Sequence, residues 1–133
     1  MLRISRRQWG DMARMDFLDR VEALVRVNLP EPARRAFDVR RMTEHCVVTA
    51  EGEGLITERA IAAFVLHMIR INPEFYLQPT LDAILGDTSV DESARMERLL
   101  TDPSEADWKE AAVICDPADY WEPFLLPGPA PGP

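Results

Sequence analysis

The sequence predicts an all-α protein, because it contains three helix-start patterns and no strand pattern. In each start pattern, a side chain that can cap a helix N-terminus stands three residues before one that can reach back to it. The patterns are Ser5 with Gln8, Ser89 with Glu92, and Asp102 with Glu105, the last with Pro103 at the first helical position. No segment alternates apolar and polar residues long enough for a strand. We expect a compact single-domain bundle of five to seven helices.

Length and composition agree with one domain over residues 1–126. A chain of 133 residues can bury roughly two-thirds of its unfolded surface in one core. Hydrophobic residues make up 47% and charged residues 29%, which is typical of globular proteins. The segment after Leu126 is rich in proline and glycine, so residues 127–133 are expected to form a flexible tail.

The first helix is predicted to run from Arg6 to Asn28. Ser5 and Gln8 form its capping box, and Ile4 and Trp9 have the spacing of a hydrophobic staple. Inward positions recur every three or four residues, at Trp9, Met12, Ala13, Phe17, Val21, Leu24, Val25 and Asn28. The arginines between them are expected on a solvated face, with acidic partners within the fold.

A second helix is predicted from about Pro32 to Ala50, because the prolines of LPEPAR end the first one. Its inward residues are expected to be Ala36, Val39, Thr43, Cys46, Val47 and Ala50. The glycines at 52 and 54 then supply the backbone freedom for a turn.

Residues 57–71 are predicted to form the central helix of the bundle. Thr57 is a good N-cap, and Asn72-Pro73 ends the helix. The residues between them are apolar on nearly every face, which is typical of a helix covered on most sides. This helix carries His67, which could be a packed residue, a pH sensor or a proton carrier. A half-exposed histidine, or one whose ring bonds a nearby acidic side chain, is the favoured reading, because local spacing places no second catalytic residue beside it.

Three shorter helices are predicted after the central one. Pro79 opens the first, which ends at Gly86. Ser89 caps the second, which runs to about Leu100, and Asp102 caps the third. In the third helix and just after it, Trp108, Ala111, Ala112 and Cys115 are expected to face inward.

The residues from Asp116 to Leu126 form an aromatic and acidic cluster. The aromatic side chains either dock on their own domain or serve as anchors for a partner, and docking is the favoured reading. Asp116 and Asp119 are explained by a helix N-terminus. If a partner-binding surface lies here, its residues are Tyr120, Trp121, Phe124, Leu125, Asp116 and Asp119.

Charge is divided unevenly along the chain. Residues 1–41 carry a net +4 and residues 82–133 a net −9, within a total of −8. The total argues against nucleic-acid binding, which needs a concentrated basic surface. The longest uncharged apolar stretch is about half of what a bilayer crossing requires. With no secretory signal in the first residues, the expected compartment is the cytoplasm.

The sequence lacks the motifs of phosphate-binding loops, zincins and α/β-hydrolases, so no catalytic or cofactor-binding residue is assigned. A metal-binding or enzymatic function is the third hypothesis, after the two protein-binding roles given at the end of this section. It would need His45, Cys46, His67 and Cys115 to be brought together by the fold. Lone histidines and cysteines on apolar helices are more often simply packed.

The run TAEGEGLITERAIAAFVLHMIRINPEF, followed by LDAILGD, resembles a pattern in small helical proteins encoded in bacterial type VI secretion clusters. The matching positions are Ala50, Gly54, Ile56, Thr57, Glu58, Phe64, Met68, Phe75, Ile84 and Leu85, with Ile4, Ser5 and Gln8 near the N-terminus. The resemblance covers about residues 4–100 and rests on structural motifs. The sequence departs from it at Glu53, where those proteins have an aromatic residue, and at the inserted Leu55.

This resemblance implies a non-enzymatic protein-binding role. The leading hypothesis is a cytoplasmic adaptor or chaperone for a secreted effector, with an effector or spike-associated protein encoded nearby as the partner. The alternative is an immunity protein that binds and blocks a cognate toxin.

Overall fold

The computed structural model describes residues 5–128, and within that range it contains helices and no strand. The α-helices are α1 (Arg6–Asn28), α2 (Glu31–Ala36), α3 (Val39–Gly52), α4 (Glu58–Arg70), α5 (Pro79–Leu85), α6 (Glu92–Thr101), α7 (Glu105–Ala112) and α8 (Pro117–Trp121). Two 3-10 helices, η1 (Phe75–Leu77) and η2 (Glu122–Phe124), complete the set. The all-α prediction is confirmed. The eight α-helices in the described range exceed the expected five to seven, because the short α2 and α8 form separate helices.

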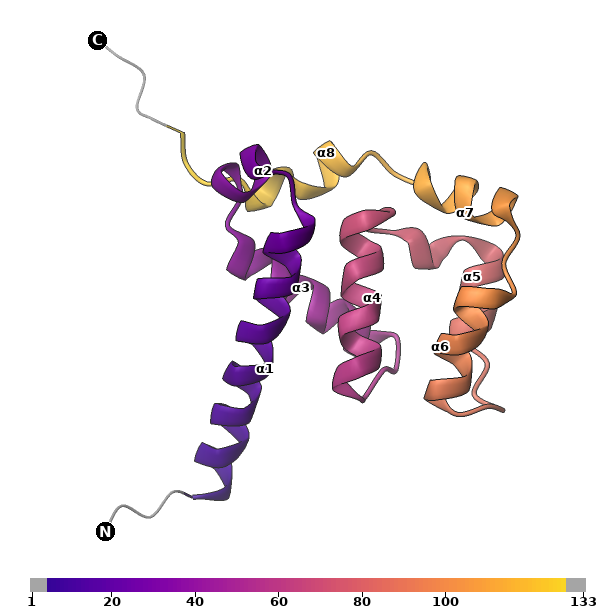
Figure 1. Ribbon diagram of the computed structural model, residues 1–133, viewed down its shortest axis with the longest axis horizontal. Coiled ribbons are helices and arrows are strands. Elements are labelled where there is room, and N and C mark those ends of the chain that lie inside the picture. Colours follow the sequence, from indigo (N-terminus) through magenta and orange to yellow (C-terminus); the bar gives the residue numbers. More distant parts are fainter. Residues whose placement is uncertain (1–4, 129–133) are drawn as a thin grey trace.

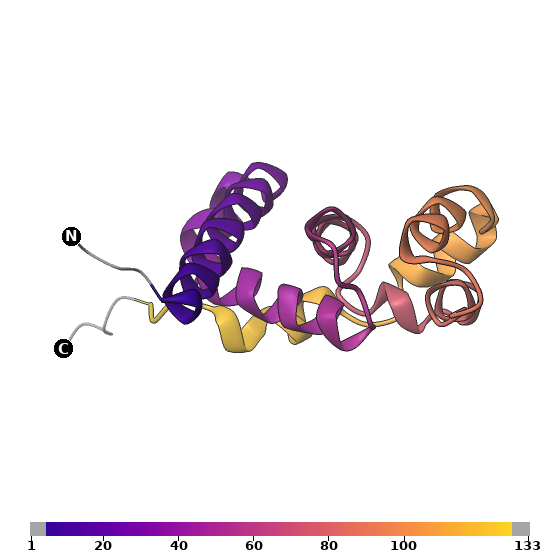
Figure 2. The ribbon, with the colours of Figure 1, turned by 90° about the horizontal axis from the view of Figure 1, so that it is seen from below.

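The helices form two packed groups joined by α4. At one end, α1, α3 and α4 pack against one another, and at the other end α5 packs against η1 and α6. The chain after α7 crosses the top of α4 in Figure 1 and returns to α2. Figure 2 shows α4 between α1 and the α5–α7 group. No helix within residues 5–128 has both the length and the apolar character to cross a membrane.

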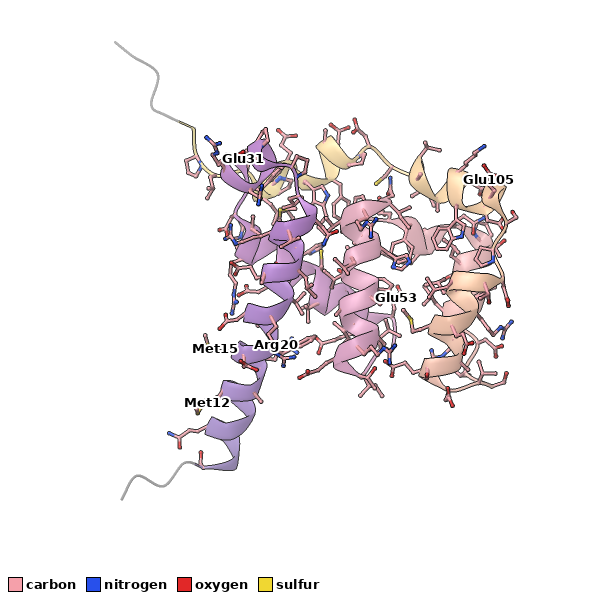
Figure 3. All side chains as sticks on the ribbon, viewed as in Figure 1. Met12, Met15, Arg20, Glu31, Glu53 and Glu105 are labelled. Carbon is pink, nitrogen blue, oxygen red and sulfur yellow. The ribbon has the colours of Figure 1, made fainter. Side chains whose placement is uncertain are left out.

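Helix α1 begins and ends as predicted, but its inward face differs. The Ser5 hydroxyl accepts from the Gln8 N–H at 3.1 Å, and the Gln8 amide oxygen accepts from the Ser5 N–H at 2.8 Å. Met12, Ala13 and Leu24 were predicted to be inward, and all three are exposed, whereas Leu18 is buried. The first turns of α1 extend past α3 and α4, with Met12 and Met15 on the outside (Figure 3), so nothing covers them. Ile4 and the Trp9 side chain, the predicted staple, lie outside the described part.

The prediction of a single helix from Pro32 to Ala50 is wrong, because the helix is interrupted at Phe37 and Asp38. The Asp38 carboxylate caps α3 by accepting from the Arg41 N–H at 3.1 Å. The Asp38 N–H donates to the Phe124 carbonyl at 2.8 Å, and Phe37 forms an isolated antiparallel bridge with Leu125. The distant segment that contains Phe124 and Leu125 therefore hydrogen-bonds to backbone groups that a continuous helix would use for its own hydrogen bonds. The predicted inward face holds from Val39 to Ala50, while Ala36 is exposed.

Helix α4 agrees with the prediction for the central helix. Gly54 has a φ of 86°, a value that favours glycine, and the Thr57 hydroxyl accepts from the Ala60 N–H at 3.3 Å. The buried residues of α4 are Ala60, Ile61, Phe64, Val65 and Met68. Asn72 then caps the following turn, since its side-chain oxygen accepts from the Glu74 N–H at 3.0 Å.

Two of the later N-caps differ from the predicted ones. Asp91, not Ser89, caps α6, and Ser104, not Asp102, caps α7. In both places two capping residues stand two positions apart, and the structure uses the second. Helix α5 opens at Pro79 and ends before Gly86, as predicted. Of the residues expected inward near α7, Ala111 is buried, Trp108 and Cys115 are half-buried, and Ala112 is exposed.

Candidate functional site

The C-terminal segment, residues 116–126, docks on α2 and α3. Trp121 is buried, and Tyr120 and Phe124 are half-buried against the core. Backbone bonds fix the end of the segment, since the Leu126 N–H donates to the Ala36 carbonyl at 2.8 Å. Of the six predicted partner-binding residues, these three aromatic ones therefore make internal contacts. The other three, Asp116, Asp119 and Leu125, are exposed.

His45 of α3 is the centre of this docking contact. Its ring lies within 6.0 Å, centroid to centroid, of Tyr120, Trp121 and Phe124. Its Nε2 is 2.6 Å from the Tyr120 hydroxyl. Burial lowers the pKa of His45 and raises the pKa of Tyr120, so at neutral pH the hydrogen bond joins a neutral imidazole and a neutral hydroxyl. Arg41 adds a cation–π contact, with its guanidinium 5.2 Å from the Phe124 ring centroid.

The chain from α7 to the C-terminal segment carries four exposed carboxylates, which we call the acidic edge: Glu110, Asp116, Asp119 and Glu122. All four side chains are exposed, and none forms an ion pair with a side chain that the structure describes. The Asp116 carboxylate also caps α8, since it accepts from the Ala118 N–H at 2.9 Å. Large apolar side chains are exposed along the same stretch, at Val113, Leu125 and Leu126. The edge therefore combines unpaired carboxylates with exposed apolar groups.

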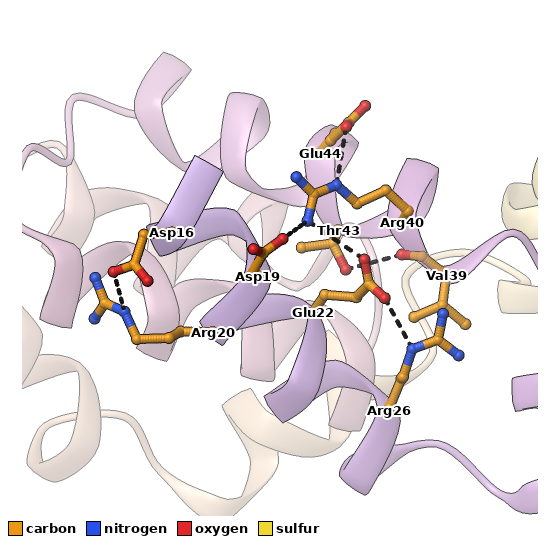
Figure 4. A network of polar contacts seen from close by, with 9 residues as sticks. All are labelled: Asp16, Asp19, Arg20, Glu22, Arg26, Val39, Arg40, Thr43 and Glu44. Atoms are coloured by element: carbon orange, nitrogen blue, oxygen red, sulfur yellow. Dashed lines mark hydrogen bonds and ion pairs between the residues drawn. The ribbon is translucent and has the colours of Figure 1, made fainter. Parts of the chain in front are cut away.

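The arginine-rich N-terminal part is different, because several of its arginines form ion pairs with acidic residues of the same fold: Arg14, Arg20, Arg26, Arg35 and Arg40. Arg40 of α3 contacts Asp19 at 2.7 Å, Glu44 at 3.2 Å and Glu22 at 3.4 Å (Figure 4). Arg14 of α1 forms a two-pronged pair with Glu51, with both N···O distances at 2.8 Å. These contacts agree with the expectation that acidic partners lie within the fold.

A pocket of about 470 Å³ opens between α4 and α6. One wall comes from α4 and its cap, and the other comes from α6. The lining residues are Thr57, Arg59, Ala60, Ala63, His67, Ser93, Met96, Glu97 and Leu100. The sequence singled out His67 but not this pocket, since the opposite wall lies on a helix whose position no local spacing reveals.

The four residues of the metal hypothesis lie in separate environments. His45 faces the C-terminal segment, and His67 lines the pocket. Cys46 is fully buried, which raises its pKa to about 12, whereas the Cys115 thiol contacts the Asn72 side-chain oxygen at 3.0 Å. Across residues 5–128, no three His, Cys, Asp or Glu side chains are grouped to hold a metal ion.

Asn72 is a polar contact that the sequence identified only as a helix stop. It is buried, and its amide nitrogen donates to the Ala112 carbonyl at 3.2 Å and to the Cys115 carbonyl at 2.9 Å. It thereby joins the end of α4 to the chain that leads into the C-terminal segment.

The chain matches no protein-family model, no curated protein and no solved structure. The resemblance to accessory proteins of type VI secretion clusters therefore stays a prediction. Its matching residues have structural roles in this fold: Gly54 makes the turn, Thr57 caps α4, and Phe64 and Met68 are buried.

Proposed function

We propose that this chain is a non-enzymatic protein-binding module, a cytoplasmic adaptor or chaperone for a secreted effector of a type VI secretion system. The observation that carries the proposal is the acidic edge, whose four exposed carboxylates lie in the same stretch of chain, residues 110–126, as three exposed apolar side chains, Val113, Leu125 and Leu126. The type VI setting comes from the sequence resemblance described above.

The chemistry of the edge indicates a basic partner surface with apolar side chains. Exposed, unpaired carboxylates attract a basic segment over roughly 10 Å at moderate ionic strength and speed its encounter. Burial of the exposed apolar groups against a partner makes the free energy of binding more favourable. The aromatic residues Tyr120, Trp121 and Phe124 pack on the core and hold the C-terminal segment in place, so they support binding without being its contact surface.

Co-purification with the effector encoded beside this chain tests the proposal. The expected result is a complex that stays together in gel filtration at micromolar concentration, and effector that is less soluble or less well loaded when the chain is absent. If the two proteins elute separately and the effector is soluble and loaded without the chain, the adaptor role is wrong.

A growth assay separates the adaptor from an immunity protein. An immunity protein rescues cells that express the toxic effector, whereas an adaptor need not. Rescue without any effect on effector loading would replace the adaptor proposal with the immunity alternative.

A further inference from the structure

The pocket between α4 and α6 has a mixed lining. Besides His67, its apolar residues are Ala60, Ala63, Met96 and Leu100, and its polar residues are Thr57, Arg59, Ser93 and Glu97. Ala60 and Ala63, one helical turn apart on α4, leave room between the helices. Met96 and Leu100 of α6 form the facing wall. The volume of about 470 Å³ is that of a site for a small organic group or a large side chain.

One ring nitrogen of His67, which lines this pocket, forms a hydrogen bond with the backbone of its own helix. Its Nδ1 lies 2.7 Å from the Ala63 carbonyl oxygen, and a carbonyl can only accept, so Nδ1 carries the proton. Burial, first of all, and the charge of Arg70 lower the pKa of His67, which keeps the ring neutral at pH 7. In a neutral ring protonated at Nδ1, Nε2 is a hydrogen-bond acceptor.

The acceptor atom Nε2 has no partner among the described residues, and the imidazole ring is held in one orientation. Among the described residues, Nε2 has no hydrogen-bond partner, and it is not one of the polar atoms sealed from solvent. The ring centroids of Phe75 and Trp108 lie 5.3 Å and 5.7 Å from that of His67, each at an interplanar angle of 32°. These two rings and the Ala63 bond fix the orientation of the imidazole.

We propose that the α4–α6 pocket binds an aromatic ring that carries an N–H or O–H donor, the side chain of a tryptophan or tyrosine, through a hydrogen bond to Nε2 of His67. An aromatic ring would pack against Ala60, Ala63 and Leu100 and make a favourable contact with the Met96 sulfur. The assignment of the ring to a partner protein rests on the proposed function. The preference of the pocket for such a ring does not depend on that function.

The donor requirement follows from the open acceptor. A phenyl or aliphatic group that displaced water from Nε2 would leave this nitrogen unpaired, which weakens binding. A carboxylate brings no proton to donate. An ammonium group also carries donors, but it is small and would leave the apolar part of the lining, Ala60, Ala63, Met96 and Leu100, uncovered. An indole or a phenol meets both demands of the site.

Titration with indole and 1-methylindole tests the proposal on the isolated protein. The two probes differ in the N–H donor, and both fit the pocket. We expect saturable binding of indole by NMR, a shift of the His67 Nε2 nitrogen-15 resonance, and about three- to tenfold weaker binding of 1-methylindole. Equal affinities for the two probes, or no saturable binding of indole, would overturn the proposal.

Matched variants locate the effect. His67→Phe keeps a ring between Phe75 and Trp108 but removes the acceptor, so the two probes should bind equally. Ala63→Leu narrows the pocket and should weaken both, while His45→Phe, outside the pocket, should preserve their ratio. Indole binding unchanged in Ala63→Leu would place the probe elsewhere and contradict the proposal. Because no partner takes part, failure here leaves the co-purification result untouched, and the reverse also holds.

Discussion

The carboxylate of Glu92, the first residue of α6, completes the N-terminus of α4 at Thr57. It accepts from the Thr57 N–H at 3.0 Å and from the Thr57 hydroxyl at 2.9 Å, and it also accepts from the Ile56 N–H at 3.1 Å. The Thr57 hydroxyl accepts in turn from the Ala60 N–H. One side chain thus joins the two helices that form the pocket, at the lower ends of α4 and α6 in Figure 1.

Replacing Glu92 with alanine should lower the free energy of unfolding by about 2 kcal/mol, because two backbone donors lose their acceptor. The control is Glu97→Ala, a change on the same helix at an exposed carboxylate that forms no ion pair among the described residues. It should change stability by less than about 0.5 kcal/mol. Urea unfolding followed by circular dichroism measures both, and equal effects would refute the bridging role of Glu92.

Tyr120→Phe should destabilise the protein by about 1 kcal/mol, since His45 Nε2 loses its hydrogen-bond partner in a half-buried contact. It should also make the C-terminal segment more sensitive to limited proteolysis. Tyr76→Phe is the matched control, because within residues 5–128 the Tyr76 hydroxyl forms no hydrogen bond with another side chain. If the Tyr120 variant is cleaved no faster than the Tyr76 variant, the hydroxyl does not hold the segment.

Stability should fall as the pH drops from 7.5 to 5.5. The pKa values of His45 and His67 are lowered by burial, so below the ordinary value of about 6.5 the unfolded chain binds more protons than the folded one. Mild acid therefore favours unfolding. The carboxyl groups of Glu51 and Asp87, whose pKa values are lowered by their arginine and serine contacts, add a further loss only below about pH 4.5.

The pH effect is checked by urea midpoints at pH 7.5, 6.5 and 5.5. In the double variant His45→Gln/His67→Gln the dependence on pH in this range should flatten, whatever the absolute stability of the variant. A dependence as steep as that of the wild type would show that other groups cause it.

The two cysteines should react very differently with a thiol reagent in the native protein. Cys46 is buried and its pKa is raised to about 12, so little thiolate is present and little of it is reachable. Cys115 is half-buried, and its pKa is raised as well, so it should react slowly but well before Cys46. Mass spectrometry of the labelled chain measures the order, and a Cys115→Ser variant should label only after unfolding.

Elements with local start signals were the ones that could be predicted. The capping box of Ser5 and Gln8, the cap at Thr57 and the opening Pro79 each act within three or four residues. Sequence spacing could not choose between Ser89 and Asp91, because both stand where a cap is allowed. The carboxylate of Glu92, on which the first choice relied, is used by a different helix.

Features set by distant contacts could not be predicted. The break at Phe37 depends on backbone bonds to Phe124 and Leu125, near the other end of the chain. For the candidate sites, the sequence favoured docking of the aromatic cluster and left the role of His67 undecided. It could not reveal that His67 lines a pocket, since that depends on where α6 lies.

The most direct test of the protein-binding proposal is the affinity of the chain for its neighbouring effector after charge reversal on the acidic edge. Glu110→Lys/Asp119→Lys should weaken binding by at least about tenfold at low salt, and the loss should shrink as salt is added. The control Asp11→Lys/Asp82→Lys makes the same change in net charge at exposed positions off the edge and should bind like the wild type. Equal affinities for both double variants would contradict the role assigned to the edge.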